Sequence, residues 1–134
     1  MIKVMLFVKR KAGLTREEFR DRYEAGHVPL AIAELQHLKR YVRNFVTPSR
    51  GLPEPDFDVV TEFWFEDWEA WKATTGYALG AETGKALAED EAVFMDRSSM
   101  RFVVVEERVA EVEAVRGALK TRSGTADGGG HYRF

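Results

Sequence analysis

The segment Ile2-Lys3-Val4-Met5-Leu6-Phe7-Val8-Lys9-Arg10 decides the fold that this sequence predicts. It is rich in β-branched and aromatic residues and is followed by the chain-breaking pair Ala12-Gly13, so it indicates a β-strand. Alternate side chains of a strand point to opposite faces of a sheet. The segment therefore presents apolar side chains to both faces: Val4, Leu6 and Val8 to one, and Met5 and Phe7 to the other.

The residues after this strand carry the signals of a helix start. Thr15 is followed three residues later by Glu18, and this capping-box spacing satisfies the amide groups left unpaired in the first turn of a helix. We expect Gly26 to interrupt the helix, and Pro29 to occupy the first turn of a renewed helix that runs to Leu35. The first strand is thus followed by a helical region in two parts.

Strand and helix patterns continue through the rest of the chain. Residues 38–46, 57–65 and 101–107 have the composition of strands, and residues 47–55 contain three prolines and form a loop. Between the last two strands, a helical region begins at Asp67, is broken by Gly76 and Gly80, and resumes over residues 81–94. The order β-α-β-β-α-β with right-handed crossovers predicts an α+β, ferredoxin-like fold with a four-stranded antiparallel sheet.

The length of the chain, 134 residues, fits one domain with an appended segment. We assign residues 1–108 to the ferredoxin-like domain. Residues 109–134 form a C-terminal extension, a short helix followed by a flexible glycine-rich tail that ends in His131-Tyr132-Arg133-Phe134.

Composition excludes several classes of function. The net charge of −2 gives no positive field that would attract a nucleic acid. No stretch of the sequence is long and apolar enough to span a membrane, so we expect neither a nucleic acid nor a membrane as partner. Residues 1–4 open as a strand rather than as a signal peptide, so we expect a cytoplasmic protein. The absence of cysteine excludes disulfides, thiolate nucleophiles and cysteine-bound metals.

The second face of the predicted sheet needs a cover. Two helices cover one face, yet the first and last strands are apolar on both faces, and a large apolar face is unusual on a monomer. We expect a second copy to cover this face in a two-fold homodimer, which closes into a dimeric α/β barrel. The alternative is that the residues after position 108 fold over the sheet.

One histidine is the best candidate for chemistry. The stretch Arg22-Tyr23-Glu24-Ala25-Gly26-His27-Val28-Pro29-Leu30 places His27 at a bend between two apolar segments, and an imidazole can gain or lose a proton near neutral pH. The alternative is a capping or surface role for His27. Candidates for binding an apolar ligand in the barrel are residues of the predicted strands: Tyr41, Arg43, Phe7, Phe45 and Trp64.

Tyr41 and Arg43 rank first among these, because a tyrosine or arginine among apolar strand residues can orient an anionic or phenolic substrate. The alternatives are a solvated arginine at a sheet edge and, for Trp64, a place in the core or the dimer interface.

Metal and cofactor motifs are absent from the sequence. His27 and His37 are ten residues apart and His131 lies in the tail, so no short histidine spacing of a metal site occurs. We interpret Glu89-Asp90-Glu91 as solvated charge on a helix. Without a glycine-rich phosphate loop, a nucleotide or flavin site has no support, and we expect no metal and no cofactor.

The sequence resembles the EthD-domain family over about residues 3–107. The resemblance is carried by residues 6–19, by Tyr23-Glu24 leading to His27-Val28-Pro29-Leu30, by Arg40-Tyr41-Val42 with Asn44, and by Asp90-Glu91 with Phe94-Met95-Asp96. It implies a dimeric α/β barrel of ferredoxin-like subunits, and relatives linked to ether degradation, aromatic polyketide modification and muconolactone isomerisation. It also implies that the characteristic histidine of the family corresponds to His27.

Three functions are compatible with these observations. The first is a small enzyme without nucleotide or metal cofactor, an oxygenase or an isomerase/dehydratase, acting on an aromatic, polyketide-like or lactone substrate. In it His27 shuttles a proton, and an oxidation would draw its electrons from the carbanion of the substrate itself. The second is a non-catalytic accessory protein that holds a small hydrophobic metabolite in the barrel. The third is an assembly module with a filled interior.

Overall fold

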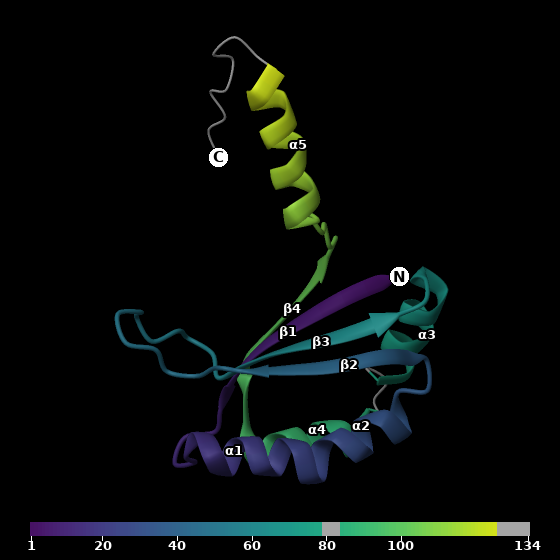
Figure 1. The fold of residues 1–134 in the computed structure, drawn as a ribbon. Helices are drawn as coiled ribbons and strands as arrows, with labels where there is room; N and C mark the ends of the chain where they lie inside the picture. The colour runs from purple at the N-terminus through teal and green to yellow at the C-terminus, as the bar shows by residue number, and fades with distance from the viewer. Residues whose placement is uncertain (79–83, 126–134) are drawn as a thin grey trace.

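The computed structural model describes residues 1–78 and 84–125 and confirms the predicted fold. The four strands pair antiparallel in the order β2-β3-β1-β4, and helices α1, α2 and α4 lie on one side of the sheet (Figure 1). The elements are β1 (Ile2–Arg10), α1 (Arg16–Arg22), a π-helical turn η1 (Tyr23–His27), α2 (Val28–Glu34), β2 (Leu38–Phe45), β3 (Val59–Phe65), α3 (Trp68–Ala78), α4 (Lys85–Phe94), β4 (Met95–Val105) and α5 (Val112–Thr125).

The predicted capping box at the start of α1 is confirmed. The Thr15 hydroxyl accepts a hydrogen bond from the Glu18 backbone amide at 3.1 Å, and the Glu18 carboxylate accepts one from the Thr15 backbone amide at 2.9 Å. Both bonds satisfy backbone groups that a helix start leaves unpaired.

The predicted interruption at Gly26 is wrong, because the chain stays helical from α1 through α2. The helix widens at η1, where the Val28 amide donates to the Tyr23 carbonyl five residues back. A Cβ at Gly26 would lie 3.1 Å from the guanidinium carbon of Arg22. Glycine therefore makes room for a side chain here and does not end the helix.

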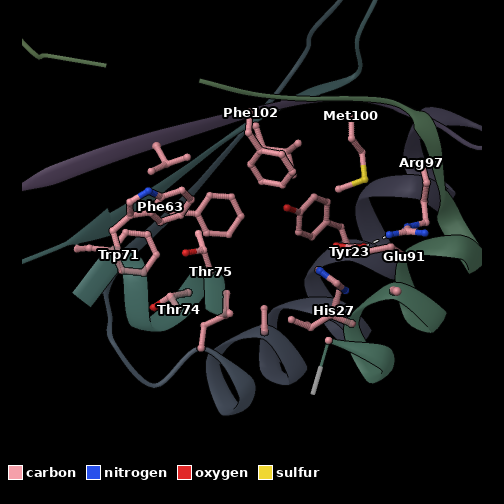
Figure 2. Close-up of a pocket in the computed structure, with 18 residues that line it drawn as sticks. Tyr23, His27, Phe63, Trp71, Thr74, Thr75, Glu91, Arg97, Met100 and Phe102 are labelled. Carbon is pink, nitrogen blue, oxygen red and sulfur yellow. Dashed lines mark hydrogen bonds and ion pairs between the residues drawn. The ribbon is translucent and has the colours of Figure 1, made fainter. Parts of the chain in front are cut away.

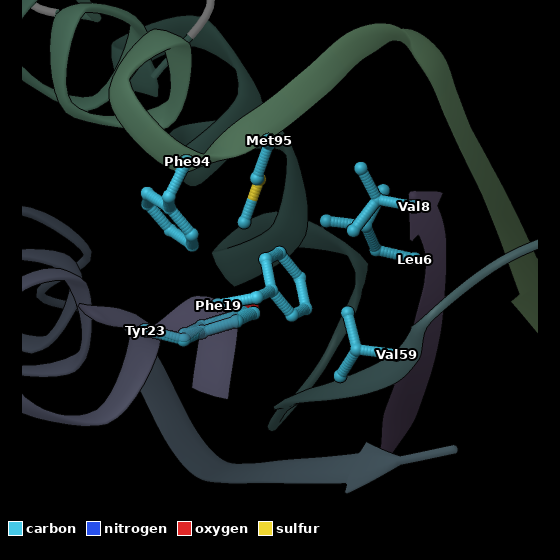
Figure 3. Close-up of a cluster of buried hydrophobic side chains, with 7 residues drawn as sticks. All are labelled: Leu6, Val8, Phe19, Tyr23, Val59, Phe94 and Met95. Atoms are coloured by element: carbon cyan, nitrogen blue, oxygen red, sulfur yellow. The ribbon is translucent and has the colours of Figure 1, made fainter. Parts of the chain in front are cut away.

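The core fills the space between the helices and the inner face of the sheet, which is the face turned toward α1, α2 and α4. Val8 of β1 pairs with Val59 of β3 on this face, and Phe19, Tyr23 and Phe94 pack over them from the helices (Figure 3). All five side chains are buried. Burying one such side chain contributes about 1.5–3 kcal/mol to folding, so this cluster fixes the helices on the sheet.

The outer face of the sheet, on the other side, carries partly exposed apolar residues such as Met5, Phe7 and Val60. Helix α5 projects away from the body of the molecule, with Val112 and Val115 exposed (Figure 1). The described part of the C-terminal extension therefore does not fold over the sheet, and that alternative is wrong for residues 109–125. The linker composition of residues 123–130 predicts no helix there, and this is wrong for residues 123–125, because α5 continues to Thr125. Residues 126–134 lie outside the described residues.

Further boundaries differ from the sequence prediction, among them the start of β3 at Val59 rather than at residue 57 and the end of β4 at Val105 rather than at residue 107. Strand β4 begins at Met95 and not at residue 101, because the polar Ser99 accepts the Lys9 amide at 2.8 Å where the pairing with β1 shifts. Helix α3 begins beside its predicted cap, since Asp67 accepts the Ala70 amide at 2.9 Å, but it continues past Gly76. The predicted break at Gly80 lies outside the described residues. In the described ranges, no helix combines the length and the apolar character needed to cross a membrane.

Candidate functional site

A cavity of about 450 Å³ lies between the inner face of the sheet and helices α2, α3 and α4 (Figure 2). It has two ends of different character. One end is walled by aromatic side chains, Phe63 of β3 and Trp71 of α3, and the other by His27 of η1, Glu91 of α4 and Arg97 of β4. We call these the aromatic end and the polar end.

His27 is held at the polar end by a carboxylate from a distant part of the chain. Its Nδ1 lies 2.8 Å from Oδ2 of Asp90, and Arg22 pairs with the other oxygen of Asp90. A carboxylate accepts hydrogen bonds only, so neutral His27 carries its proton on Nδ1 and keeps a free lone pair on Nε2. This arrangement leaves Nε2 as a proton acceptor.

Burial keeps His27 in the form that accepts a proton. The side chain is 5% exposed, and desolvation lowers the pKa of His27 below its ordinary value. Asp90 opposes this effect, whereas the nearby Arg22 adds to it. Both the low exposure and the lowered pKa favour the neutral imidazole at pH 7, and the neutral form can accept a proton.

The interpretation of Glu89-Asp90-Glu91 as solvated charge is wrong for two of the three residues. Glu89 is exposed, but Asp90 binds His27 and Glu91 lines the cavity. The side chain of Glu91 is 15% exposed, and its Oε1 lies 3.4 Å from Nε of Arg97. Burial raises the pKa of Glu91, although the positive charge of Arg97 acts in the opposite direction.

The aromatic end offers flat apolar walls. The rings of Phe65 and Trp71 lie 5.4 Å apart, and those of Phe63 and Phe102 lie 6.4 Å apart. The hydroxyl of Thr74 at this end donates to the Ala70 carbonyl at 2.9 Å and so stays within its own helix. These walls suit a planar apolar ligand, because aromatic rings favour edge and offset contacts with other rings.

Of the six residues that the sequence indicates for the site, only His27 lines this cavity. Phe7 and Trp64 lie on the outer face. The Phe7 ring stands 5.1 Å from that of Phe57, and the Trp64 indole donates to Glu62 at 3.2 Å.

Tyr41, Arg43 and Phe45 lie on the inner face but behind the cavity wall. The Tyr41 hydroxyl donates to that of Tyr23 at 3.3 Å, and Arg43 pairs with Glu24 at 2.7 Å. Phe45 packs edge-on against Tyr23, with ring centroids 5.7 Å apart. These residues support Tyr23, which does line the cavity.

Sequence reasoning missed most of the cavity wall, including Glu91, Arg97, Phe63, Trp71 and Phe102. The one signal for the acidic residues was the quoted resemblance at Asp90-Glu91. Within the described ranges, no group of three or more histidines, cysteines and acidic residues gathers as a metal site would require.

Comparisons with known proteins place these features in a wider context. A family model described as the EthD domain matches residues 11–98. A search of curated proteins finds no match.

Three solved structures show the same fold. An EthD-family protein of Bacillus halodurans is 18% identical, with a TM-score of 0.59 over 81% of this chain and 100% of that chain. An EthD-like protein of Ralstonia eutropha is 23% identical, with a TM-score of 0.56 over 82% of this chain and 93% of that one. A protein of unknown function from Bacteroides fragilis, described as dimeric with a ferredoxin-like fold, is 15% identical, with a TM-score of 0.51 over 79% and 95% of the two chains.

Proposed function

Because the chain belongs to the EthD domain family, we propose that it is a small-molecule enzyme in which His27 moves a proton within the cavity. The observation that carries this proposal is the 2.8 Å contact between His27 Nδ1 and Asp90, which leaves Nε2 as the basic atom. A carboxylate behind a histidine fixes its tautomer and stabilises the imidazolium that forms.

The two ends of the cavity support a proposal for the substrate class. The aromatic end suits an aromatic, polyketide-like or lactone substrate, and the polar end supplies acid and base groups. Proton transfer by these groups requires neither a nucleotide nor a metal. The reaction is then an isomerisation, a dehydration, or an oxygenation in which a carbanion of the substrate supplies the electrons.

The test uses 5-nitrobenzisoxazole, a flat aromatic probe whose ring opens to a coloured phenolate when a base removes one proton. We expect His27→Gln to slow ring opening by about 100-fold, with little change in melting temperature. His37→Gln is the matched control, since His37 is exposed and outside the cavity. Unchanged turnover in His27→Gln, or a wild-type rate no higher than that of free imidazole, would refute the proposal.

A second candidate function, a non-catalytic protein that holds a hydrophobic metabolite, is favoured by the apolar walls around Phe63 and Trp71. Native mass spectrometry of the purified protein separates the two functions. A ligand retained unchanged, together with no turnover of the probe, would support the binding function alone.

We also propose that two copies pair through their outer faces to form the dimeric α/β barrel. The partly exposed apolar residues of that face support this assembly, and the Bacteroides fragilis relative is described as dimeric. Light scattering at micromolar concentration should give twice the chain mass. Val103→Asp on the outer face should shift the measured mass toward that of the monomer. Val93→Asp, on the exposed side of α4, should leave the measured mass unchanged. A monomeric wild-type protein would contradict the assembly.

A further inference from the structure

We propose that Glu91 is a second catalytic residue, which donates a proton to a carbonyl oxygen of the substrate while His27 removes a proton from the neighbouring carbon. The substrate is then an apolar ketone or lactone that can enolise. This inference rests on the proposed role of His27 and adds a partner, a reaction class and a substrate class to it.

The geometry gives Asp90 and Glu91 different duties although they are consecutive in α4. Asp90 binds His27 with one oxygen and Arg22 with the other, so both of its oxygens are occupied by protein. Glu91 faces the cavity at the same end as His27, beside Arg97 (Figure 2). A substrate at the polar end therefore meets Glu91 and His27, while Asp90 stays behind the histidine.

The charges around these two residues fit proton transfer in one direction. When His27 takes a proton and Glu91 gives one, the imidazole becomes positive and the carboxylate negative. Asp90 lies 2.8 Å from the first charge, and Arg97 lies 3.4 Å from the second. Each charge that develops thus has an opposite charge already in place, so little reorganisation is needed during the reaction.

The directions of the two pKa shifts agree with this direction of proton transfer. Burial lowers the pKa of His27 and raises that of Glu91, against the opposing effects of Asp90 and Arg97 respectively. Both changes favour the uncharged forms, a neutral base and a neutral acid. These are the forms in which His27 accepts a proton and Glu91 donates one.

The proposed step balances without any other reagent. The carbon–hydrogen bond next to the carbonyl breaks, its proton goes to His27 Nε2, and its electron pair forms a carbon–carbon double bond. The carbonyl oxygen takes the proton of Glu91 and becomes an enol. In a substrate with a carbon–carbon double bond next to the carbon that loses the proton, this enol is a conjugated dienol. Return of the proton from His27 to the far carbon of the dienol, and of the enol proton to Glu91, moves that double bond into conjugation with the carbonyl. The product is an isomer of the substrate, and both groups are regenerated.

The experiment compares two probes with the full-length protein. In D₂O, NMR follows exchange of the hydrogens next to the carbonyl of 2-tetralone, a flat apolar ketone whose enolisation needs both a base and an acid. Opening of 5-nitrobenzisoxazole needs mainly a base, because its leaving oxygen becomes a stable phenolate. We expect Glu91→Gln to slow exchange about 100-fold more than it slows ring opening. Glu89→Gln, on the exposed side of α4, is the matched control.

The pH profile separates a catalytic from a structural role. Wild-type exchange should fall at low pH, where His27 is protonated, and again at high pH, where Glu91 loses its proton. In Glu91→Gln the residual exchange should keep the low-pH fall and lose the high-pH one.

Equal slowing of both probes, or an unchanged high-pH limb, would overturn the role of Glu91 while leaving that of His27 intact. Loss of neither reaction in His27→Gln would instead overturn the proposed function on which this inference rests.

Discussion

The two ends of the cavity are built from different kinds of contact. At the polar end, His27 is held by a hydrogen bond to Asp90, and Asp90 by an ion pair with Arg22. Three side chains from two separate stretches of chain must therefore keep their relative positions. At the aromatic end, the rings of Phe63 and Trp71 supply shape. The difference predicts that substitutions at the polar end change the rate of reaction, whereas those at the aromatic end change the affinity for substrate.

The strongest way to break this contrast is Asp90→Asn. An asparagine amide can donate to Nδ1 and so place the histidine proton on Nε2, where it blocks the base. We expect kcat for 5-nitrobenzisoxazole to fall by about 100-fold or more, as for other residues that orient a catalytic histidine. NMR of the imidazole nitrogens should show the changed tautomer. Asp21→Asn, on the exposed surface of α1, is the control. An unchanged tautomer would contradict the proposal that Asp90 sets the position of the proton on His27.

At the aromatic end, Trp71→Leu should raise KM for 5-nitrobenzisoxazole by up to about tenfold and leave kcat within about twofold. The reason is that an aromatic contact contributes about 0.5–1.5 kcal/mol to the binding free energy. Trp68→Leu, in the same helix but 52% exposed and outside the cavity, should change neither constant. A loss confined to kcat would mean that the aromatic end takes part in the chemistry.

The pH dependence of stability sharpens the comparison, because the two titrating groups of the polar end act in opposite directions. Because the pKa of His27 is lowered in the folded protein, the unfolded chain binds a proton at this histidine more tightly than the folded protein does. Stability should fall as pH drops below about 6.5, by at most about 1.4 kcal/mol per pH unit. Urea unfolding from pH 7.5 to 5.5 should show a smaller fall in His27→Gln than in the wild type, with His37→Gln unchanged. An equal fall in all three would contradict a buried neutral histidine.

The raised pKa of Glu91 has the opposite sign. It contributes stability while the carboxyl is protonated, and this contribution is lost as pH rises from about 4.5 through the folded value. Over that pH range the free energy of unfolding should therefore fall less in Glu91→Gln than in the wild type. The same urea-unfolding series, extended to these pH values, measures the difference.

The smallest effect is expected for Gly26→Ala. The added Cβ would sit 3.1 Å from the Arg22 guanidinium and displace it from Asp90, since the tip of an arginine moves more easily than the helix. We expect a loss of about two- to fivefold in kcat with KM unchanged, smaller than for direct partners of His27. Gly117→Ala in α5, where nothing lies within 4 Å, is the control and should leave kcat unchanged. Full activity in Gly26→Ala would show that Arg22 adds nothing to the polar end.

The fold could be predicted from sequence because its signals are local. The β-branched and aromatic composition of β1 and the capping box at Thr15 are each readable within a few residues. The early start of β4 was not readable, since the polar Ser99 serves a shift in strand pairing that depends on Lys9, 90 residues away.

The site was predictable only at His27. Asp90 lies 63 residues further along the chain, and nothing local distinguishes its carboxylate from that of exposed Glu89. Phe7 and Trp64 failed to reach the cavity for a different reason, because they lie on the outer face. A shift of one residue exchanges the two faces of a strand, so Trp64 and Phe63 could not be told apart until the pairing of β3 was known.

The π-helical turn explains how one helical stretch can face the core and the cavity at once. Between residues 16 and 35, the buried residues recur at every fourth position: Phe19, Tyr23, His27, Ala31 and Leu35. In an unbroken α-helix, a spacing of four rotates each successive side chain by about 40°, so five such residues would spiral about 160° around the axis. The wider turn at Tyr23–His27 absorbs one residue and winds much of that rotation back. Deleting a single residue there would turn α2 out of phase with α1, so the aim of the imidazole is set by the number of residues in the turn as much as by their kind.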